Sequence, residues 1–109
     1  MIVEERSYRL HVGKLPEYLR LYGEEGVAIQ APLLGQMVGW FTSHDIGELN
    51  VVVHLWAYAD LADRAERRAR LAASPEWQAF VSRLQPLIER QESRILTPAP
   101  WSPIGGEGR

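Results

Sequence analysis

Residues 48–57, with the sequence ELNVVVHLWA, have the composition and spacing of a buried β-strand. Side chains alternate between the two faces of a strand, so this run has two distinct sides. One side is wholly apolar, and we expect it to pack against helices; its members are Leu49, Val51, Val53, Leu55 and Ala57. The other side mixes polar and aromatic groups, and we expect it to lie on a face that no helix covers; its members are Asn50, Val52, His54, Trp56 and Tyr58.

The segments before this run predict a strand, a helix and a second strand. Residues 2–12 show partial β alternation and stop at a glycine, and residues 36–45 again favour a strand. Between them, residues 14–34 change to a helical period. Gly23 and Gly26 weaken this helix by up to about 1 kcal/mol each, so we expect it to bend or fray there.

The segments after the run predict two helices and a last strand. Asp60 can cap a helix that runs to about residue 73, and Ser74 can cap the next helix. Pro86 removes a backbone N–H and crowds the preceding turn, so we expect the second helix to loosen there. Residues 92–97 favour the fourth strand.

The first of these two helices is rich in arginine. Acidic residues alternate with its arginines, which predicts a solvated face. These arginines are Arg64, Arg67, Arg68 and Arg70. We expect the inward side to consist of Leu61, Ala65, Ala69 and Ala72.

The resulting order of elements is β-α-β-β-α-α-β, which predicts an α+β, ferredoxin-like βαββααβ fold with a four-stranded antiparallel sheet. Helices would cover one face and leave an apolar patch on the other, which is costly in water. Two copies that join their uncovered faces would form a dimeric α+β barrel. We expect one domain over residues 1–98 and an irregular tail, rich in proline and glycine, over residues 99–109.

The composition of the chain limits its possible ligands, partners and location. The net charge of −2 argues against a nucleic-acid partner, because phosphate binding needs a surplus of lysine and arginine. The chain has no cysteine, so it has no disulfide and no thiolate chemistry. No apolar run reaches the about 20 residues that span a bilayer, so we expect no membrane span and a cytoplasmic location. The three histidines show no ligand spacing, so we expect no metal and no cofactor.

Several segments closely resemble the NIPSNAP family: IGELNVVVHLWAY (46–58), DLADRAERR (60–68), SPEWQAF (74–80), ESRILTP (92–98) and, more loosely, EERSYRL (4–10). The resemblance implies a dimeric α+β barrel. Family members more often have an apolar residue at the position of Glu5, which leaves open which face of the first strand is buried. The wider superfamily includes cofactor-free monooxygenases, haem-degrading enzymes and isomerases, so the resemblance does not select an activity.

The first candidate site consists of Asn50, His54 and Trp56 on the mixed side of the third strand. Alternate strand positions lie roughly 7 Å apart, so we expect these side chains to line one cavity inside the barrel. His54 could act as a general base, and Asn50 could orient a carbonyl or stabilise an oxyanion. Trp56 could stack on an aromatic ring. The alternative is a structural role, in which Asn50 and His54 form hydrogen bonds across the dimer.

The second candidate site consists of Glu4, Arg6 and Tyr8, which alternate on the first strand. Arg6 could bind a carboxylate, and Tyr8 could donate a hydrogen bond or a proton. The alternative is a ladder of ion pairs with Glu92 and Arg94 of the fourth strand.

Together these features predict a homodimer, or a higher oligomer of dimers, whose barrel cavity binds a small hydrophobic or aromatic molecule. If the chain is an enzyme, cofactor-independent oxygenation or isomerisation suits the absence of metal and nucleotide motifs. The alternative function is a non-catalytic protein-interaction module that uses the outer helices and the tail.

Overall fold

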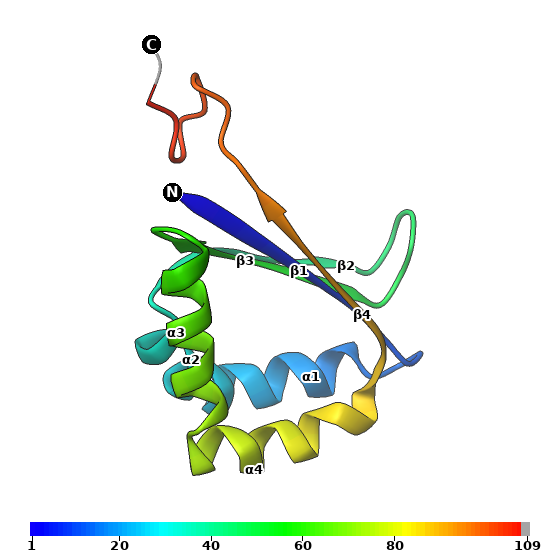
Figure 1. Cartoon of the computed structure of the whole chain (residues 1–109). Coiled ribbons are helices and arrows are strands. Elements are labelled where there is room, and N and C mark those ends of the chain that lie inside the picture. The colour runs from blue at the N-terminus through cyan, green and yellow to red at the C-terminus, as the bar shows by residue number, and fades with distance from the viewer. Residues whose placement is uncertain (108–109) are drawn as a thin grey trace.

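The computed structural model describes residues 1–107. In it, four antiparallel strands form one sheet in the order β2-β3-β1-β4 (Figure 1). The strands are β1 (Ile2–Leu10), β2 (Gln36–Ser43), β3 (Val51–Tyr58) and β4 (Ile88–Leu96). β1 pairs with both β3 and β4, and β4 forms one edge of the sheet. The predicted α+β, ferredoxin-like fold is confirmed.

The first helical segment is continuous but irregular. It consists of α1 (Leu15–Leu21), the π-helical turn η1 (Tyr22–Gly26) and α2 (Val27–Leu34). The expected weak point at Gly23 and Gly26 therefore takes the form of a wider turn. Packing also requires a glycine at position 26, because a Cβ atom there would lie 2.5 Å from the Phe80 ring.

The second helical layer consists of α3 (Leu61–Ala72), α4 (Pro75–Leu84) and the 3₁₀ turn η2 (Gln85–Leu87). Both predicted caps are present. The Asp60 side chain accepts a hydrogen bond from the backbone N–H of Asp63 at 2.8 Å, and Ser74 accepts one from Trp77 at 3.2 Å. Pro86 lies in η2, so the helix loosens there, as the sequence predicts.

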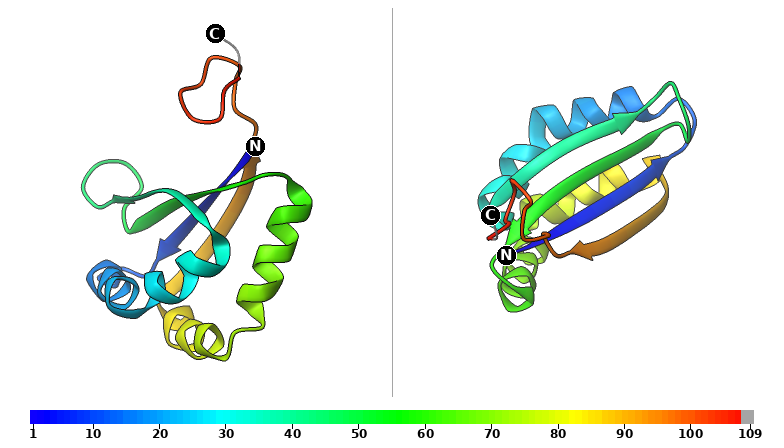
Figure 2. Two further views of the ribbon diagram at one scale, coloured as in Figure 1. Left: turned by 90° about the vertical axis from the view of Figure 1, so that its left-hand side faces the viewer. Right: turned by 90° about the horizontal axis from the view of Figure 1, so that it is seen from above.

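All helices lie on the same face of the sheet, and the other face is uncovered (Figure 2). The predicted orientation of β3 is wrong. Trp56 and Tyr58 pack with Leu71 of α3, and Val52 packs with Phe80 of α4. The mixed side of β3 therefore lies beneath the helices, and the all-apolar side faces outward: Val51, Val53, Leu55 and Ala57. The large rings need the thick helical layer for burial, whereas the small apolar side chains leave a flat outer face.

The predicted orientation of α3 is also wrong. Leu61 is 61% exposed, and the three alanines expected to point inward are exposed as well. Arg64, Arg67 and Arg68 are instead partly buried on the side toward the sheet. Exposure of an alanine costs little, whereas the buried carboxylate of Glu4 on β1 requires a cation opposite it.

The uncovered face carries both apolar and charged groups. Trp40 and Phe41 point to opposite faces, as expected for neighbours in a strand: Trp40 stacks on His54, whereas Phe41 is 60% exposed on the outer face. On the same outer face, the Arg94 guanidinium pairs with Glu5 at 2.7 Å. The buried face of the first strand is therefore the one that carries Glu4, whereas Glu5 faces outward.

The segment after β4 contains no helix or strand as far as Glu107. Residues 108–109, which the prediction also assigned to the tail, lie outside the described residues. Among residues 1–107, none of the helices has both the length and the apolar character needed to cross a membrane.

Candidate functional site

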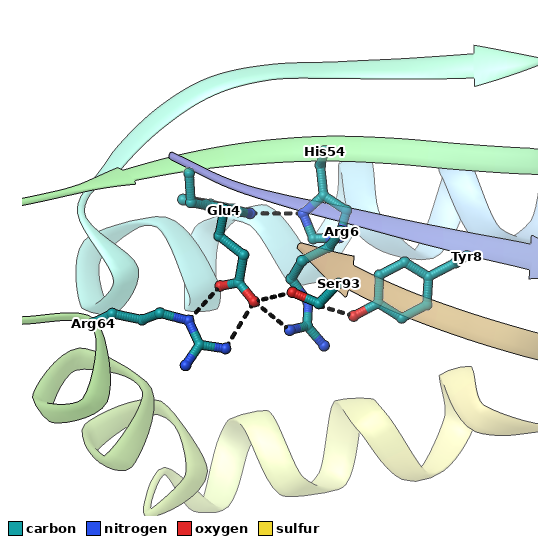
Figure 3. Close-up of polar contacts among 7 residues, drawn as sticks. Glu4, Arg6, Tyr8, His54, Arg64 and Ser93 are labelled. Carbon is teal, nitrogen blue, oxygen red and sulfur yellow. Dashed lines mark hydrogen bonds and ion pairs between the residues drawn. The ribbon is translucent and has the colours of Figure 1, made fainter. Parts of the chain in front are cut away.

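The carboxylate of Glu4 is the centre of a polar network between the sheet and the helices (Figure 3). Arg64 of α3 donates to both of its oxygens, from Nε to Oε1 at 3.0 Å and from Nη2 to Oε2 at 2.8 Å. Arg6 donates to Oε2 at 2.9 Å, and the Ser93 hydroxyl donates to the same oxygen at 2.5 Å. The network thus connects β1, β4 and α3 through a fully buried anion.

These donors decide the charge of Glu4. Burial by itself raises the pKa of the carboxyl group, but the hydrogen bonds from Arg64, Ser93 and Arg6 outweigh burial and lower the pKa to about 2. Glu4 is therefore an anion at neutral pH, and it cannot supply a proton. Its role in this geometry is to hold Arg6 and Arg64 in place.

Arg6 lies between Glu4 and Tyr8. Its Nε donates to the Tyr8 hydroxyl at 2.8 Å, and its guanidinium carbon lies 5.5 Å from the centre of the Tyr8 ring. The Arg6 side chain is only 14% exposed. The structure therefore brings the three residues of the second candidate site together. The alternative ladder does not form as expected, because Arg94 pairs with Glu5 on the opposite face.

His54 is fully buried between two rings. It stacks on Trp40, with ring centres 4.0 Å apart and planes at 8°, and on Tyr8, with ring centres 5.3 Å apart. The indole N–H of Trp56 donates to its Nδ1 at 2.6 Å. A neutral imidazole that accepts at Nδ1 carries its proton on Nε2, and Nε2 has no hydrogen-bond partner among residues 1–107.

The environment of His54 favours a structural role. Burial, and then the positive charge of Arg6, lower its pKa to about 3, so the ring is neutral at physiological pH. A general base is most effective when its pKa lies near the operating pH, which is not the case here. The Trp56 indole binds His54, and His54 is stacked between neighbouring rings, so neither side chain is free to contact a ligand in this conformation. The roles predicted for His54 in proton transfer and for Trp56 in stacking on a ligand stay predictions.

Asn50 does not join His54 and Trp56 on the strand. It lies one residue before β3 with a φ of 61°, a left-handed conformation that asparagine tolerates better than most residues. Its carbonyl accepts a hydrogen bond from the backbone N–H of Leu10 at 2.8 Å. The third strand begins at Val51 and not at residue 48, so the alternation of side chains along a strand does not extend to Asn50.

A cavity of about 510 Å³ lies between the sheet and the helices. Aromatic and apolar side chains form much of its wall: Tyr8, Tyr22, Leu71, Trp77, Leu84 and Ile88. Its polar groups include Arg6, Gln30, Arg68 and Gln91. Arg6 and Tyr8 were predicted from the alternation of β1. Tyr22, Gln30 and Arg68 were not predicted as cavity residues, because their orientation depends on the π-helical turn and on the rotation of α3 about its axis. The glycines at positions 23 and 26 are the one feature of the sequence that indicates an irregular helix there.

This architecture defines a class of protein: a ferredoxin-like α+β domain with a cavity between its sheet and its helices. Within that class, a model of the NIPSNAP family matches residues 3–103. The chain therefore belongs to the NIPSNAP family, as the resemblance suggested.

Curated relatives support this assignment. The chain is 37% identical over 103 residues to Protein NipSnap homolog 1 of Danio rerio, which covers 94% of this chain and 36% of the relative. It is 38% identical over 104 residues to Protein NipSnap homolog 2 of Homo sapiens, which covers 94% of this chain and 35% of the relative. The chain thus spans about a third of the length of these two proteins.

Solved structures agree on the fold. A NIPSNAP family protein from Agrobacterium tumefaciens is 57% identical with a TM-score of 0.92, and the match covers 94% of this chain and 97% of that one. A NIPSNAP-like domain protein from Burkholderia xenovorans is 51% identical with a TM-score of 0.91, over 94% and 88% of the two chains. An antibiotic biosynthesis monooxygenase has a TM-score of 0.62 at 11% identity, over 91% and 99%, a likeness of fold alone.

Proposed function

We propose that this chain binds a small, largely apolar organic molecule in the cavity between the sheet and the helices. The observation that carries the proposal is the cavity itself, whose volume of about 510 Å³ falls within the range of small-molecule sites. Its wall combines aromatic and aliphatic side chains with polar and charged groups in about equal number, so it can both enclose a ligand and orient it.

The proposed site differs in place from the sequence-based expectation. The sequence placed the ligand between two opposed sheets, whereas Arg6 and Tyr8 line a cavity beneath the helices. The network around Glu4 supports the proposal, because it holds Arg6 from several sides before any ligand arrives. A site whose polar groups are already fixed loses less entropy when it binds.

We propose in addition that two copies join through their uncovered faces, which forms the expected homodimeric barrel. Phe41 is 60% exposed there, and Leu55, Leu96 and Ile104 line a shallow apolar hollow on the same face. The charged part of the face carries both signs, which a twofold partner can match. Size-exclusion chromatography with light scattering tests this: the parent should elute as a dimer, and Phe41→Glu should shift it toward the monomer. A monomeric parent would contradict the dimer but not the cavity.

The proposal is a binding function. A cofactor-independent oxygenation or isomerisation of the bound molecule stays the catalytic alternative, with His54 and Asn50 as the residues first predicted for it. The cytoplasmic location also stays a prediction.

A thermal-shift panel of small aromatic compounds tests ligand binding. A compound present at ten times its Kd should raise Tm by about 5 °C for a domain of this size. Val81 of α4 lines the cavity, so Val81→Phe should fill part of it and abolish the shift. Ala79→Phe is the matched control, because Ala79 is exposed on the same helix and the variant should respond like the parent.

Two results would contradict the proposal: equal shifts for the parent and a folded Val81→Phe variant, or no shift of the parent with any compound. The second result would favour the interaction module that uses the outer helices and the tail. Far-UV circular dichroism of each variant verifies that it is folded.

A further inference from the structure

We propose that the ligand is a carboxylic acid with an aromatic body, and that its carboxylate lies between Arg6 and Arg68. This inference rests on the proposed binding function and specifies the chemical class of the ligand. It is argued from unused hydrogen-bond donors, from the local charge and from the distribution of polar and apolar groups around the cavity.

Arg6 has an unused hydrogen-bond donor. Its Nε donates to Tyr8 and its Nη1 donates to Glu4, but its Nη2 makes no hydrogen bond within the described chain. The side chain is only 14% exposed, and it lines the cavity. A nearly buried guanidinium gains from an acceptor that uses its remaining N–H groups, and a carboxylate matches this planar fork.

Arg68 is the second unused cation, and the sequence explains why. On α3, Arg67 pairs with Asp63 and Arg70 pairs with Glu66, both at a spacing of four residues. The residues four positions from Arg68 are Arg64 and Ala72, neither of which is acidic. Arg68 accordingly makes no hydrogen bond or ion pair in residues 1–107, although it is partly buried and lines the cavity.

The charges near the cavity do not balance. Arg6 and Arg64 share the single buried carboxylate of Glu4, and Arg68 lines the same cavity as Arg6, so these three cations exceed that carboxylate by two positive charges. Glu89 also lines the cavity, but it is exposed and lies 3.9 Å from His11. A ligand carboxylate would offset part of the excess in a region where water is partly excluded, and such pairs are stronger there than on an open surface.

The rest of the wall specifies the body of the acid. Tyr22 and Trp77 present rings, and Leu71 and Leu84 add aliphatic surface, which suits an aromatic group. Gln30 is only 3% exposed, and its Oε1 has no partner among the described residues. A buried acceptor without a partner favours a ligand that has an N–H or O–H donor on its ring.

A carboxylate fits this site better than a phosphate. A phosphate has three oxygens to satisfy, and the guanidinium of Arg90 is not available as a third cation, because it pairs with Glu48 and Glu92. Two guanidinium groups match one planar, singly charged group.

Isothermal titration calorimetry with matched probes tests the inference. The probes are benzoate, 3-phenylpropanoate and indole-3-acetate, each with its primary amide, together with phenyl phosphate. At least one acid should bind the parent about ten times more tightly than its amide, since a charge-assisted pair at a partly buried site contributes about this factor. Indole-3-acetate should bind more tightly than the two acids that lack a ring donor.

Variants of α3 identify the cation. Arg68→Gln should remove most of the preference for the acid over the amide, and Arg68→Lys should restore part of it. Arg70→Gln is the matched control, because Arg70 is exposed on the same helix and does not line the cavity. It should keep the full preference.

The outcomes separate the two proposals. Equal binding of an acid and its amide to the parent would overturn the carboxylate inference and leave the binding function intact. Tighter binding of phenyl phosphate than of every acid would also overturn it. A preference that survives in Arg68→Gln would show that Arg68 is not the anchor. Absence of binding by every probe, charged or neutral, would contradict both the binding function and this inference.

Discussion

Replacement of Glu4 by glutamine should destabilise the protein far more than replacement of an exposed glutamate. The buried carboxylate accepts hydrogen bonds from Arg64, Arg6 and Ser93, whereas an amide in its place would direct N–H groups toward the guanidinium donors. The size of this loss in unfolding free energy follows from the pKa of Glu4. A fall from the usual 4.5 to about 2 on folding corresponds to about 3 kcal/mol of stability at pH 7.

The pH dependence provides a second, sharper signature. The pKa of Glu4 is lower in the folded state than in the unfolded state, so its contribution is complete above pH 4.5 and is lost as pH falls toward 2. The difference in unfolding free energy between the parent and Glu4→Gln should be about 3 kcal/mol at pH 7 and about half of that at pH 3. Urea unfolding followed by tryptophan fluorescence, at one protein concentration, measures both values.

Glu24→Gln is the control for this experiment. Glu24 pairs with Arg20 at 3.1 Å, and both side chains are exposed, so the loss should stay below about 1 kcal/mol. Equal losses for Glu4→Gln and Glu24→Gln at pH 7 would refute the argument that the buried network determines stability. A difference for Glu4→Gln that does not shrink between pH 7 and pH 3 would refute the assignment of its lowered pKa.

Three further predictions concern single positions. His54 has a pKa of about 3 in the folded state and 6.5 in the unfolded state, so protonation of the unfolded state should cost the parent about 2 kcal/mol between pH 7 and pH 5, and His54→Phe should lack this loss in urea unfolding. Gly26→Ala should destabilise by about 1–3 kcal/mol, because its Cβ would meet the Phe80 ring at 2.5 Å. Ser74→Ala should lower the unfolding free energy by about 1 kcal/mol through loss of the α4 cap.

Each of these has its own control. His44 is exposed, so His44→Phe should keep the pH dependence of the parent, and a loss of that dependence there would contradict the assignment to His54. Gly23 lies in the same π-helical turn with no atom within 4 Å of an added Cβ, so Gly23→Ala should not destabilise the protein. A Ser74→Thr variant that is no more stable than Ser74→Ala would contradict the capping explanation.

The order of the elements could be predicted because it depends on local chemistry. Periodicity distinguished strands from helices, and the caps at Asp60 and Ser74 and the loosening at Pro86 depend on atoms within a few residues. The βαββααβ order then leaves few ways to pair four strands. The same local reasoning located Arg6 and Tyr8 on one side of β1.

Orientation could not be predicted in the same way. Both sides of β3 are apolar enough to be buried, so alternation defines two sides without assigning either to the helices. The packing of Trp56 against Leu71 and the ion pair between Glu4 and Arg64 decide the matter, and residues 4 and 64 are far apart in the chain. The sequence by itself determined which residues share a side, because that follows from backbone geometry. Only the tertiary structure decided which side is covered and which arginines reach the cavity, because those depend on contacts between distant segments.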